Sequence, residues 1–314
     1  MTFDVVVIGG GAAGLAGALA LARARRSVLV VDAGAPRNAP AGHVHNYLAR
    51  EGVPPGELLA LGRAEVTGYG AEILTDAVTG LAARPGGGFE VRLSGTGVQA
   101  RRLLVATGLV DELPPVPGLA ERWGTTVLHC PYCHGWEVRD ARLAVLGGLN
   151  RPFTLHQVQL VRQWSDTVVF APNDITLDDE ERTRITARGI EIVDGPVTAM
   201  TDHPDGPVAL EFADGRVLPR AAVFVGPNFV PHDDLLTELD CARDATGTLT
   251  VDPTGATSTP GAWAAGNVVR DTQAIVSAAS GVTAGIAVNH YLLAQDVERA
   301  VSAATRPPDS TSLR

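Results

Sequence analysis

The chain has 314 residues, 45% of them hydrophobic and 19% charged, with a formal net charge of −10. This composition excludes a disordered or fibrous protein, and the length favours two domains. All 25 basic residues are arginine, which excludes a lysine Schiff base or P-loop lysine, and the acidic balance leaves no basic surface for nucleic acid. No apolar stretch reaches the roughly 18 residues of a membrane span, and the first residues do not form a signal peptide, so we expect a cytoplasmic α/β protein.

The first 32 residues predict a strand–turn–helix–strand unit. Residues 3–8 are apolar, as in a strand buried on both faces, and an Ala- and Leu-rich helix then runs to about Arg26. Residues 27–31 form a second apolar strand that ends at Asp32. This order is that of a βαβ unit.

The turn of this unit predicts a dinucleotide site. It reads Gly9-Gly10-Gly11-Ala12-Ala13-Gly14, which fits G-x-G-x-x-G between a strand and a helix. In this pattern Gly9 allows the tight turn, Gly11 lets a pyrophosphate approach, and Gly14 lets the helix pack on the strand. The helix N-terminus at Ala12 and Ala13 offers N–H groups to phosphates. Asp32, 18 residues after Gly14, can accept a ribose hydroxyl.

A second unit of the same kind follows in the middle of the chain. After an apolar strand at 102–107 and a Pro-bearing linker at 111–118, residues 143–146 predict a strand, a turn and a helix to about Ser165, and 167–170 the next strand. The last part returns to strands and a final helix from Thr272 to about Leu293. We therefore predict a first domain from residues 1–112 and 236–300, a second from 113–235, and a disordered tail at 301–314.

The sequence Cys130-Pro131-Tyr132-Cys133 is the strongest chemical signal. Two cysteines at this spacing can close a small disulfide ring, and such pairs often have a lowered thiolate pKa. A zinc site would need a second pair of ligands, which the chain does not offer at the usual spacing, so no metal is predicted; a buried inert pair is the other alternative. Cys241, the remaining cysteine, is interpreted as structural.

Several motifs resemble those of a known family. Residues Trp263-Ala264-Ala265-Gly266-Asn267 and Val105-Ala106-Thr107-Gly108 resemble the flavin motifs of the pyridine nucleotide–disulfide reductases, except that Asn267 replaces the usual Asp. With the CxxC motif and the length, nearly the whole chain resembles low-molecular-weight thioredoxin reductases. More narrowly, Cys130 to Glu137 looks like the FAD-dependent dithiol oxidases that close the disulfides of gliotoxin and holomycin, and His134 stands where the reductases carry an acid.

The resemblance implies an α/β fold of two Rossmann-like three-layer domains, with a discontinuous FAD domain, and it implies a homodimer. The stretch from His43 to Leu48 often contacts the isoalloxazine in this family, although His43 and His45 could equally be surface residues. The final helix can face the flavin with its N-terminus. Besides the first turn and Asp32, the implied FAD contacts are Ala33, Arg37, Asn46, Val78, Ala106, Thr107, Gly108, Gly266, Asn267, Gln273 and Ala274.

The turn of the middle unit departs from the pattern that NADPH needs. When Gly147 is aligned with the first glycine, Leu149 takes the second glycine position and Pro152 the third. A leucine there blocks the approach of a pyrophosphate to the backbone. The next strand is followed by Pro172-Asn173-Asp174, without the arginines that would bind a 2′-phosphate. We therefore expect that NADPH does not bind, although an unusual mode of binding is the alternative.

Without NADPH, electrons must enter through thiols, and O2 is the simplest acceptor. The prediction is an FAD-dependent dithiol oxidase that forms an intramolecular disulfide in a small natural-product dithiol and yields H2O2. By resemblance, Cys133 lies against the flavin, and Cys130 meets the substrate. His134 is the first candidate for the base and His129 the second, with packing roles as alternatives. Two other functions stay open: an NADPH-dependent reductase acting on a thioredoxin-like protein, and a flavin-bearing redox sensor.

Overall fold

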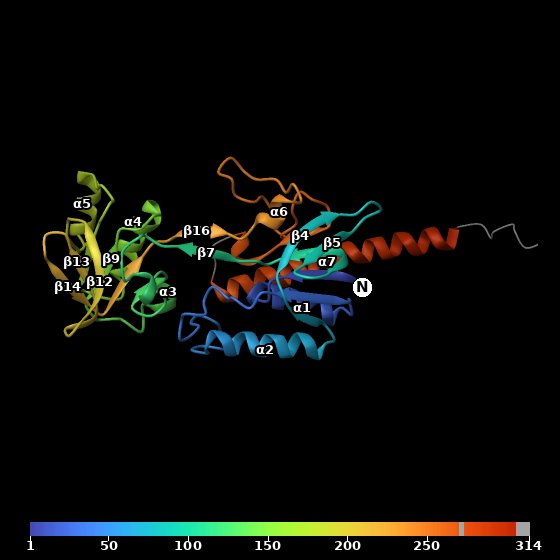
Figure 1. Cartoon of the computed structure of the whole chain (residues 1–314), viewed down its shortest axis with the longest axis horizontal. Coiled ribbons are helices and arrows are strands. Elements are labelled where there is room, and N and C mark those ends of the chain that lie inside the picture. The colour runs from blue at the N-terminus through green and yellow to red at the C-terminus, as the bar shows by residue number, and fades with distance from the viewer. Residues whose placement is uncertain (270–272, 306–314) are drawn as a thin grey trace, which may run out of the picture. The chain divides into compact units, whose positions relative to one another are not determined.

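The computed structural model describes residues 1–269 and 273–305, and Figure 1 shows its elements. The chain divides into two compact units. The first comprises Met1–Ala35, Leu59–Gly108 and Pro231–Arg314, and the second comprises Pro36–Leu58 and Leu109–Val230. The first unit therefore takes its chain from both ends of the sequence, and the predicted fold class with a discontinuous first domain is confirmed.

A parallel sheet forms the centre of the first unit. Its strand order is β3-β2-β1-β6, β17 pairs with the other side of β6, and β6 continues into an antiparallel meander with β5 and β4. Val7 of β1 lies between Val30 and Leu104, and all three are buried, as expected for strands covered on both faces. The strands are β1 (Thr2–Ile8), β2 (Val28–Asp32), β3 (Glu72–Thr75), β4 (Val78–Ala83), β5 (Phe89–Leu93), β6 (Gly97–Val105) and β17 (Ala262–Ala264).

Helices cover one face of this sheet. Residues of α1 (Ala12–Arg23), α2 (Pro55–Gly68) and α7 (Ala274–Thr305) form one apolar core with the strands, and residues around the short α6 (Asp234–Thr237) contribute to a second core on the other face. Helices α1 and α7 touch through glycines: a Cβ on Gly285 would lie 2.7 Å from the carbonyl oxygen of Gly17. The glycines thus allow the two helix backbones to approach closely.

Helix α7 is longer than the sequence predicted. It continues past Leu293 to Thr305, so the predicted helix end was wrong and residues 301–305 of the predicted tail are helical. The reason is that residues 294–305 contain Ala, Gln, Glu and Arg but no Gly or Pro, so nothing ends the helix. Thr272, the predicted start, and residues 306–314 of the predicted tail lie outside the described residues.

The second unit has its own parallel sheet, of order β11-β10-β9-β15-β8. Helices α4 and α5 pack on one face, and the antiparallel sheet β12-β13-β14 packs on the other, so this unit also has three layers. The strands are β8 (Val127–Leu128), β9 (Leu143–Leu146), β10 (Val168–Ala171), β11 (Glu191–Ile192), β12 (Val197–His203), β13 (Gly206–Phe212), β14 (Val217–Arg220) and β15 (Ala222–Val225).

The remaining elements are short. Strands β7 (Leu109–Glu112) and β16 (Asn228–Pro231) pair with each other where the chain enters and leaves the second unit. The helices of this unit are η1 (Ala120–Arg122), α3 (Pro131–His134), α4 (Arg151–Val161) and α5 (Asp179–Thr186), and η2 (Gly266–Val268) belongs to the first unit. Among the residues described, no helix combines the length and the apolar character that crossing a membrane requires.

Candidate active site

The first Gly-rich turn, at the end of β1, leaves room beside its second glycine. Gly9 has a φ of +105°, and a Cβ there would lie 2.3 Å from the Ala106 carbonyl oxygen. A Cβ on Gly14 would lie 1.9 Å from the Gly9 carbonyl oxygen. These two glycines are therefore required by the packing of the chain itself. A Cβ on Gly11, by contrast, would meet nothing within 4 Å, so the space over this residue is open to a ligand.

The helix that follows this turn begins without a polar cap. Gly11 is the N-cap of α1, and as a glycine it has no side chain that could cap this end of the helix. The N–H groups at Ala12 and Ala13 and the positive end of the helix dipole therefore face the open space at Gly11. This is the arrangement that binds a phosphate group.

The C-terminal part of the first unit reaches the same turn. Ala265 N–H donates to the Val105 carbonyl at 3.0 Å, which places β17 and η2 directly beside the end of β6. Gly266 has a φ of +79°, and a Cβ there would lie 2.8 Å from Cβ of Ala13. Asn267 follows in η2, and Gln273 and Ala274 stand at the start of α7. Motifs about 250 residues apart in sequence thus meet at one helix N-terminus.

The predicted ribose carboxylate stands at the end of β2. Asp32 Oδ2 accepts a bond from Arg63 Nη2 of α2 at 2.5 Å, and a Cβ on Gly10 would lie 2.6 Å from that carboxylate. Ala33 follows Asp32 on the exposed surface, and Val78 opens β4, half-buried against the core. Arg63 was not predicted, because an arginine on an otherwise ordinary helix has no distinguishing pattern.

Thr107 and Gly108 hold the chain where it leaves the first unit. Thr107 Oγ1 donates to the His232 carbonyl at 2.6 Å, and His232 N–H donates to the Gly108 carbonyl at 3.0 Å. Gly108 has a φ of +75°, which favours glycine at this turn. These two bonds join the strand that leaves the first unit to the segment that returns to it.

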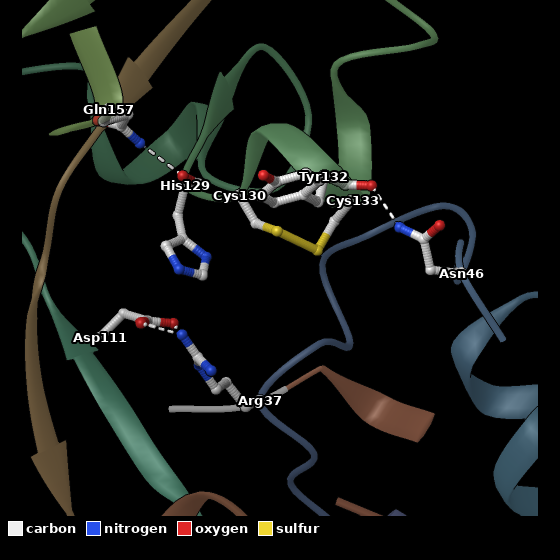
Figure 2. Close-up of a disulfide and its surroundings, with 8 residues drawn as sticks. All are labelled: Arg37, Asn46, Asp111, His129, Cys130, Tyr132, Cys133 and Gln157. Carbon is white, nitrogen blue, oxygen red and sulfur yellow. Dashed lines mark hydrogen bonds and ion pairs between the residues drawn. A yellow bond between two sulfur atoms is a disulfide. The ribbon is translucent and has the colours of Figure 1, made fainter. Parts of the chain in front are cut away.

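Arg37 and Asn46, which were predicted for the flavin, belong to the second unit. Arg37 forms two bonds to Asp111, of 2.8 and 2.6 Å. Asn46, with a φ of +59°, donates from Nδ2 to the Tyr132 carbonyl at 2.6 Å, inside the CxxC motif. Figure 2 shows Asn46 near the disulfide and Arg37 paired with Asp111. Segment Pro36–Leu58 therefore contributes to the surroundings of the cysteines.

The two cysteines of the motif form a disulfide on a one-turn helix. Cys130 and Cys133 are bonded, with their Cα atoms 5.2 Å apart, as Figure 2 shows. Pro131 opens α3, and the N–H groups of Cys133 and His134 donate to the Cys130 carbonyl at 3.0 and 3.1 Å. Proline suits the first helical position because it has no N–H to satisfy. The local sequence thus folds the cysteines into the geometry of a disulfide.

His134 is largely buried next to this disulfide. Burial lowers its pKa below the usual 6.5, the neighbouring His45 and His129 lower it further, and Glu137 raises it. Desolvation penalises the charged imidazolium, so the ring is neutral at pH 7. A neutral imidazole is the form that accepts a proton from a thiol.

His129 has aromatic surroundings. Its ring stacks on Phe153 at a centroid distance of 5.8 Å and meets Phe229 edge-on at 5.3 Å. Its carbonyl accepts a 2.5 Å bond from Nε2 of Gln157, a fully buried residue of α4 that Figure 2 also shows. Gln157 was missed in the sequence, because a glutamine in a helix carries no signal of burial. It fixes the backbone immediately before Cys130.

The second Gly-rich turn differs from the first in its helix cap and at the position of the second glycine. Cβ atoms on Gly147 and Gly148 would lie 1.8 Å and 2.1 Å from the carbonyl oxygens of Pro172 and Gly226, so these glycines serve chain packing. The Asn150 side chain caps α4 by accepting from Phe153 N–H at 3.1 Å. Leu149 is 49% exposed at the position of the second glycine.

The neighbouring charges are also paired. Arg151 Nη2 binds both carboxylate oxygens of Glu181, at 2.8 and 2.7 Å, and Asn173 Oδ1 accepts from Val197 N–H at 2.9 Å. In the described part of the chain, no three His, Cys, Asp or Glu side chains gather as metal ligands would.

Comparisons with known proteins agree on one family. Residues 3–285 match the family described as pyridine nucleotide-disulphide oxidoreductase. The chain is 32% identical to "Thioredoxin reductase aclD" of Aspergillus oryzae, over 84% of this chain and 88% of that protein, and 28% identical to "Thioredoxin reductase sirT" of Leptosphaeria maculans, over 94% and 96%. The crystal structure of HlmI superposes with a TM-score of 0.93 and 47% identity, over 97% of each chain.

Proposed function

The chain belongs to the pyridine nucleotide-disulphide oxidoreductase family, whose members are FAD-binding flavoproteins, and on this premise we propose that it is an FAD-dependent dithiol oxidase. In this proposal it closes an intramolecular disulfide in a small natural-product dithiol and passes the electrons to O2. The observation that carries the proposal is the Cys130–Cys133 disulfide beside the largely buried, neutral His134. A disulfide accepts an electron pair from a dithiol, and a neutral imidazole accepts the proton.

The residues at the first Gly-rich turn fit FAD. The open space at Gly11 and the uncapped start of α1 suit the pyrophosphate, and Asp32 suits a ribose hydroxyl. Gly266 packs on Ala13 at the same helix end, and Asn267, Gln273 and Ala274 follow it in the chain as the further FAD contacts of this proposal. When bound, FAD would supply the electron acceptor for the cysteine pair and react with O2 to give H2O2.

The cysteines would exchange disulfides with the substrate in two steps. One substrate thiol loses its proton to His134, and the thiolate attacks Sγ of Cys130, which breaks the Cys130–Cys133 bond and releases Cys133 as a thiolate. The second substrate thiolate then displaces Cys130, which gives the cyclic disulfide and two reduced cysteines. In total, two electrons and two protons leave the substrate. O2 takes up the same number of each when it becomes H2O2.

NADPH has no part in this proposal. This part of the proposal is supported by Leu149 at the position of the second glycine, by the Asn150 side chain that caps α4, and by the pairing of Arg151 with Glu181. The second candidate is an NADPH-dependent disulfide reductase, which is favoured by the names of the two curated relatives, both thioredoxin reductases. It requires NADPH to bind at the second turn.

One experiment separates the two candidates. The holoenzyme is made anaerobic, and the flavin absorbance is followed with dithiothreitol in one cuvette and NADPH in another. An oxidase bleaches with the dithiol alone, and its colour returns in air together with peroxide. Prompt bleaching by NADPH would overturn the proposal in favour of a reductase.

A further inference from the structure

A cluster of aromatic rings lies beside the disulfide in the second unit. The His129 ring has its centroid 5.8 Å from that of Phe153 and 5.3 Å from that of Phe229, and the two phenylalanine rings meet edge-on at 5.7 Å. Trp123, which packs against the core, lies 6.5 Å from His129. His129 directly precedes Cys130, and Figure 2 shows its ring beside the disulfide. The cluster therefore reaches the sulfur that is proposed to meet the substrate.

The two phenylalanines are not core residues. Both are half-buried, and within the described part of the chain neither belongs to the two apolar cores of this unit. Phe153 comes from α4 and Phe229 from β16. Gly226 gives the first ring its place, since a Cβ there would lie 2.9 Å from Cδ1 of Phe153. Aromatic surface that is gathered in one place and left partly open is typical of a ligand site.

The charges beside these rings oppose each other. The guanidinium of Arg37 lies over the Phe229 ring, 5.5 Å from its centroid. The same guanidinium forms two bonds to the Asp111 carboxylate, of 2.8 and 2.6 Å, so its positive charge is offset by a negative one. Aromatic rings pack best against other flat rings, face to edge or offset. The cluster thus suits an uncharged ligand that carries a flat, unsaturated ring.

The start of α4 has the same apolar character. Phe153 lies in the first turn of this helix, one residue after Pro152 and four after Leu149. In a nucleotide-binding turn the positions of Leu149 and Pro152 are small, which lets a pyrophosphate approach the backbone. Here they are larger and apolar, and Leu149 is 49% exposed. This helix start therefore favours an apolar ligand over a phosphate.

We propose that Phe153, Phe229 and the ring of His129 form a specificity site for the substrate. It holds a dithiol carried on a flat, unsaturated and uncharged ring, so that one thiol reaches Sγ of Cys130. The inference rests on the proposed function and names the substrate class for it. It adds no chemical step, because the two phenylalanines bind and orient the substrate and take no part in electron or proton transfer.

The test compares two dithiols on the FAD-loaded protein. Dithiothreitol is flexible and polar, whereas ortho-xylylene dithiol carries its thiols on a benzene ring, and both close a ring of the same size when oxidised. Flavin bleaching is followed anaerobically by stopped flow over a range of concentrations. Phe153→Leu keeps the apolar bulk but loses the ring. It should raise the half-saturating concentration of ortho-xylylene dithiol about 5-fold, keep the maximum rate, and leave the response to dithiothreitol unchanged.

Phe229→Leu is a second variant in case Phe153→Leu does not fold, and it should show the same selective loss. Phe229→Tyr keeps the ring and should behave as the wild type. Trp136→Leu is the matched control, because this exposed aromatic residue follows the same cysteines but packs on Arg139, whose guanidinium lies 3.9 Å from its ring centroid. It should respond to both dithiols as the wild type does.

Three outcomes would overturn the specificity site. They are an unchanged response to both dithiols in the two leucine variants, an equal loss for both dithiols, and a selective loss in Trp136→Leu alone. All three differ from failure of the proposed function, in which the wild-type protein itself would bleach with neither dithiol.

Discussion

The two Gly-rich turns of this chain have the same place in two similar βαβ units, yet they offer different surfaces. At the first, a side chain on Gly11 would meet nothing within 4 Å, and α1 begins without a polar cap. At the second, Leu149 stands in the equivalent position, and Asn150 caps α4. Under the proposed function, this difference implies that two or three residues at the turn decide nucleotide binding, while the sheet and helix around them stay the same.

The largest expected effect concerns how electrons enter. If the second turn binds no NADPH, the cysteine pair must receive them, and Cys130→Ser should lower dithiol-driven flavin bleaching below detection. Cys241→Ser is the control, since this buried cysteine lies outside the redox pair. Both are measured anaerobically at the flavin band. NADPH-driven bleaching in Cys130→Ser would show that the two turns are alike after all.

An exchange between the turns tests the comparison directly. Gly11→Leu places in the first turn the residue of the second, and it should weaken FAD binding by about 10-fold or more, a loss of about 1.4 kcal/mol. The chain should still fold, because the side chain meets no neighbouring atom within 4 Å at its Cβ. Leu149→Gly is the reciprocal variant and should retain FAD fully. The measurement is the FAD content of each variant after gel filtration. An equal loss of FAD in both variants would contradict the idea that only the first turn binds FAD.

The next prediction concerns His134, the base proposed for the second unit. His134→Gln removes the proposed base and should slow bleaching by dithiothreitol about 100-fold, within the range of general-base contributions. In the wild type the rate should fall only below pH 6.5, since the pKa of His134 is lowered, and the variant should lack this acid limb. His156→Gln, an exposed histidine of α4, is the control. A wild-type rate in His134→Gln would assign the base elsewhere.

The caps of the two helices give a smaller difference. Asn150→Ala removes the side-chain bond at the start of α4 and should lower the free energy of unfolding by about 1 kcal/mol. Gly11→Ala removes no bond from α1, so its effect should be smaller. Chemical denaturation of both variants measures the difference. An Asn150→Ala protein as stable as the wild type would show that this side-chain bond does not stabilise the start of α4.

The smallest effect is on stability against pH. Because the folded pKa of His134 is below 6.5, the unfolded chain binds a proton that the folded chain does not, and stability falls as pH drops from 6.5 towards that lowered pKa. His134→Gln should lose less stability over this window than the wild type. Melting temperatures at pH 7.5 and 5.5 provide the comparison, and parallel losses would show that His134 is not buried as a neutral ring.

Much of this architecture was predictable from local patterns. The two βαβ units, the turn at Gly9–Gly14 and the CxxC pair each depend on residues that are close in sequence. The sheet β12-β13-β14 and the full length of α7 were not predicted, because short alternating strands and a helix without an end signal carry weak patterns. The contacts of Asn46, Gln157 and Arg63 depend on residues far apart in the chain, which no local pattern reveals.

The contact between the two ends of the chain has a consequence for biosynthesis. Gly266 packs on Ala13, and Gly285 of α7 approaches Gly17 of α1, so the place proposed for FAD includes residues made at the start and near the end of translation. The N-terminal strands cannot complete their unit until β17 and α7 have been synthesised. All residues of the second unit leave the ribosome before that point. The site proposed for FAD is therefore complete only after α7 has been made, and we expect a truncated chain without α7 to bind no FAD and to be colourless.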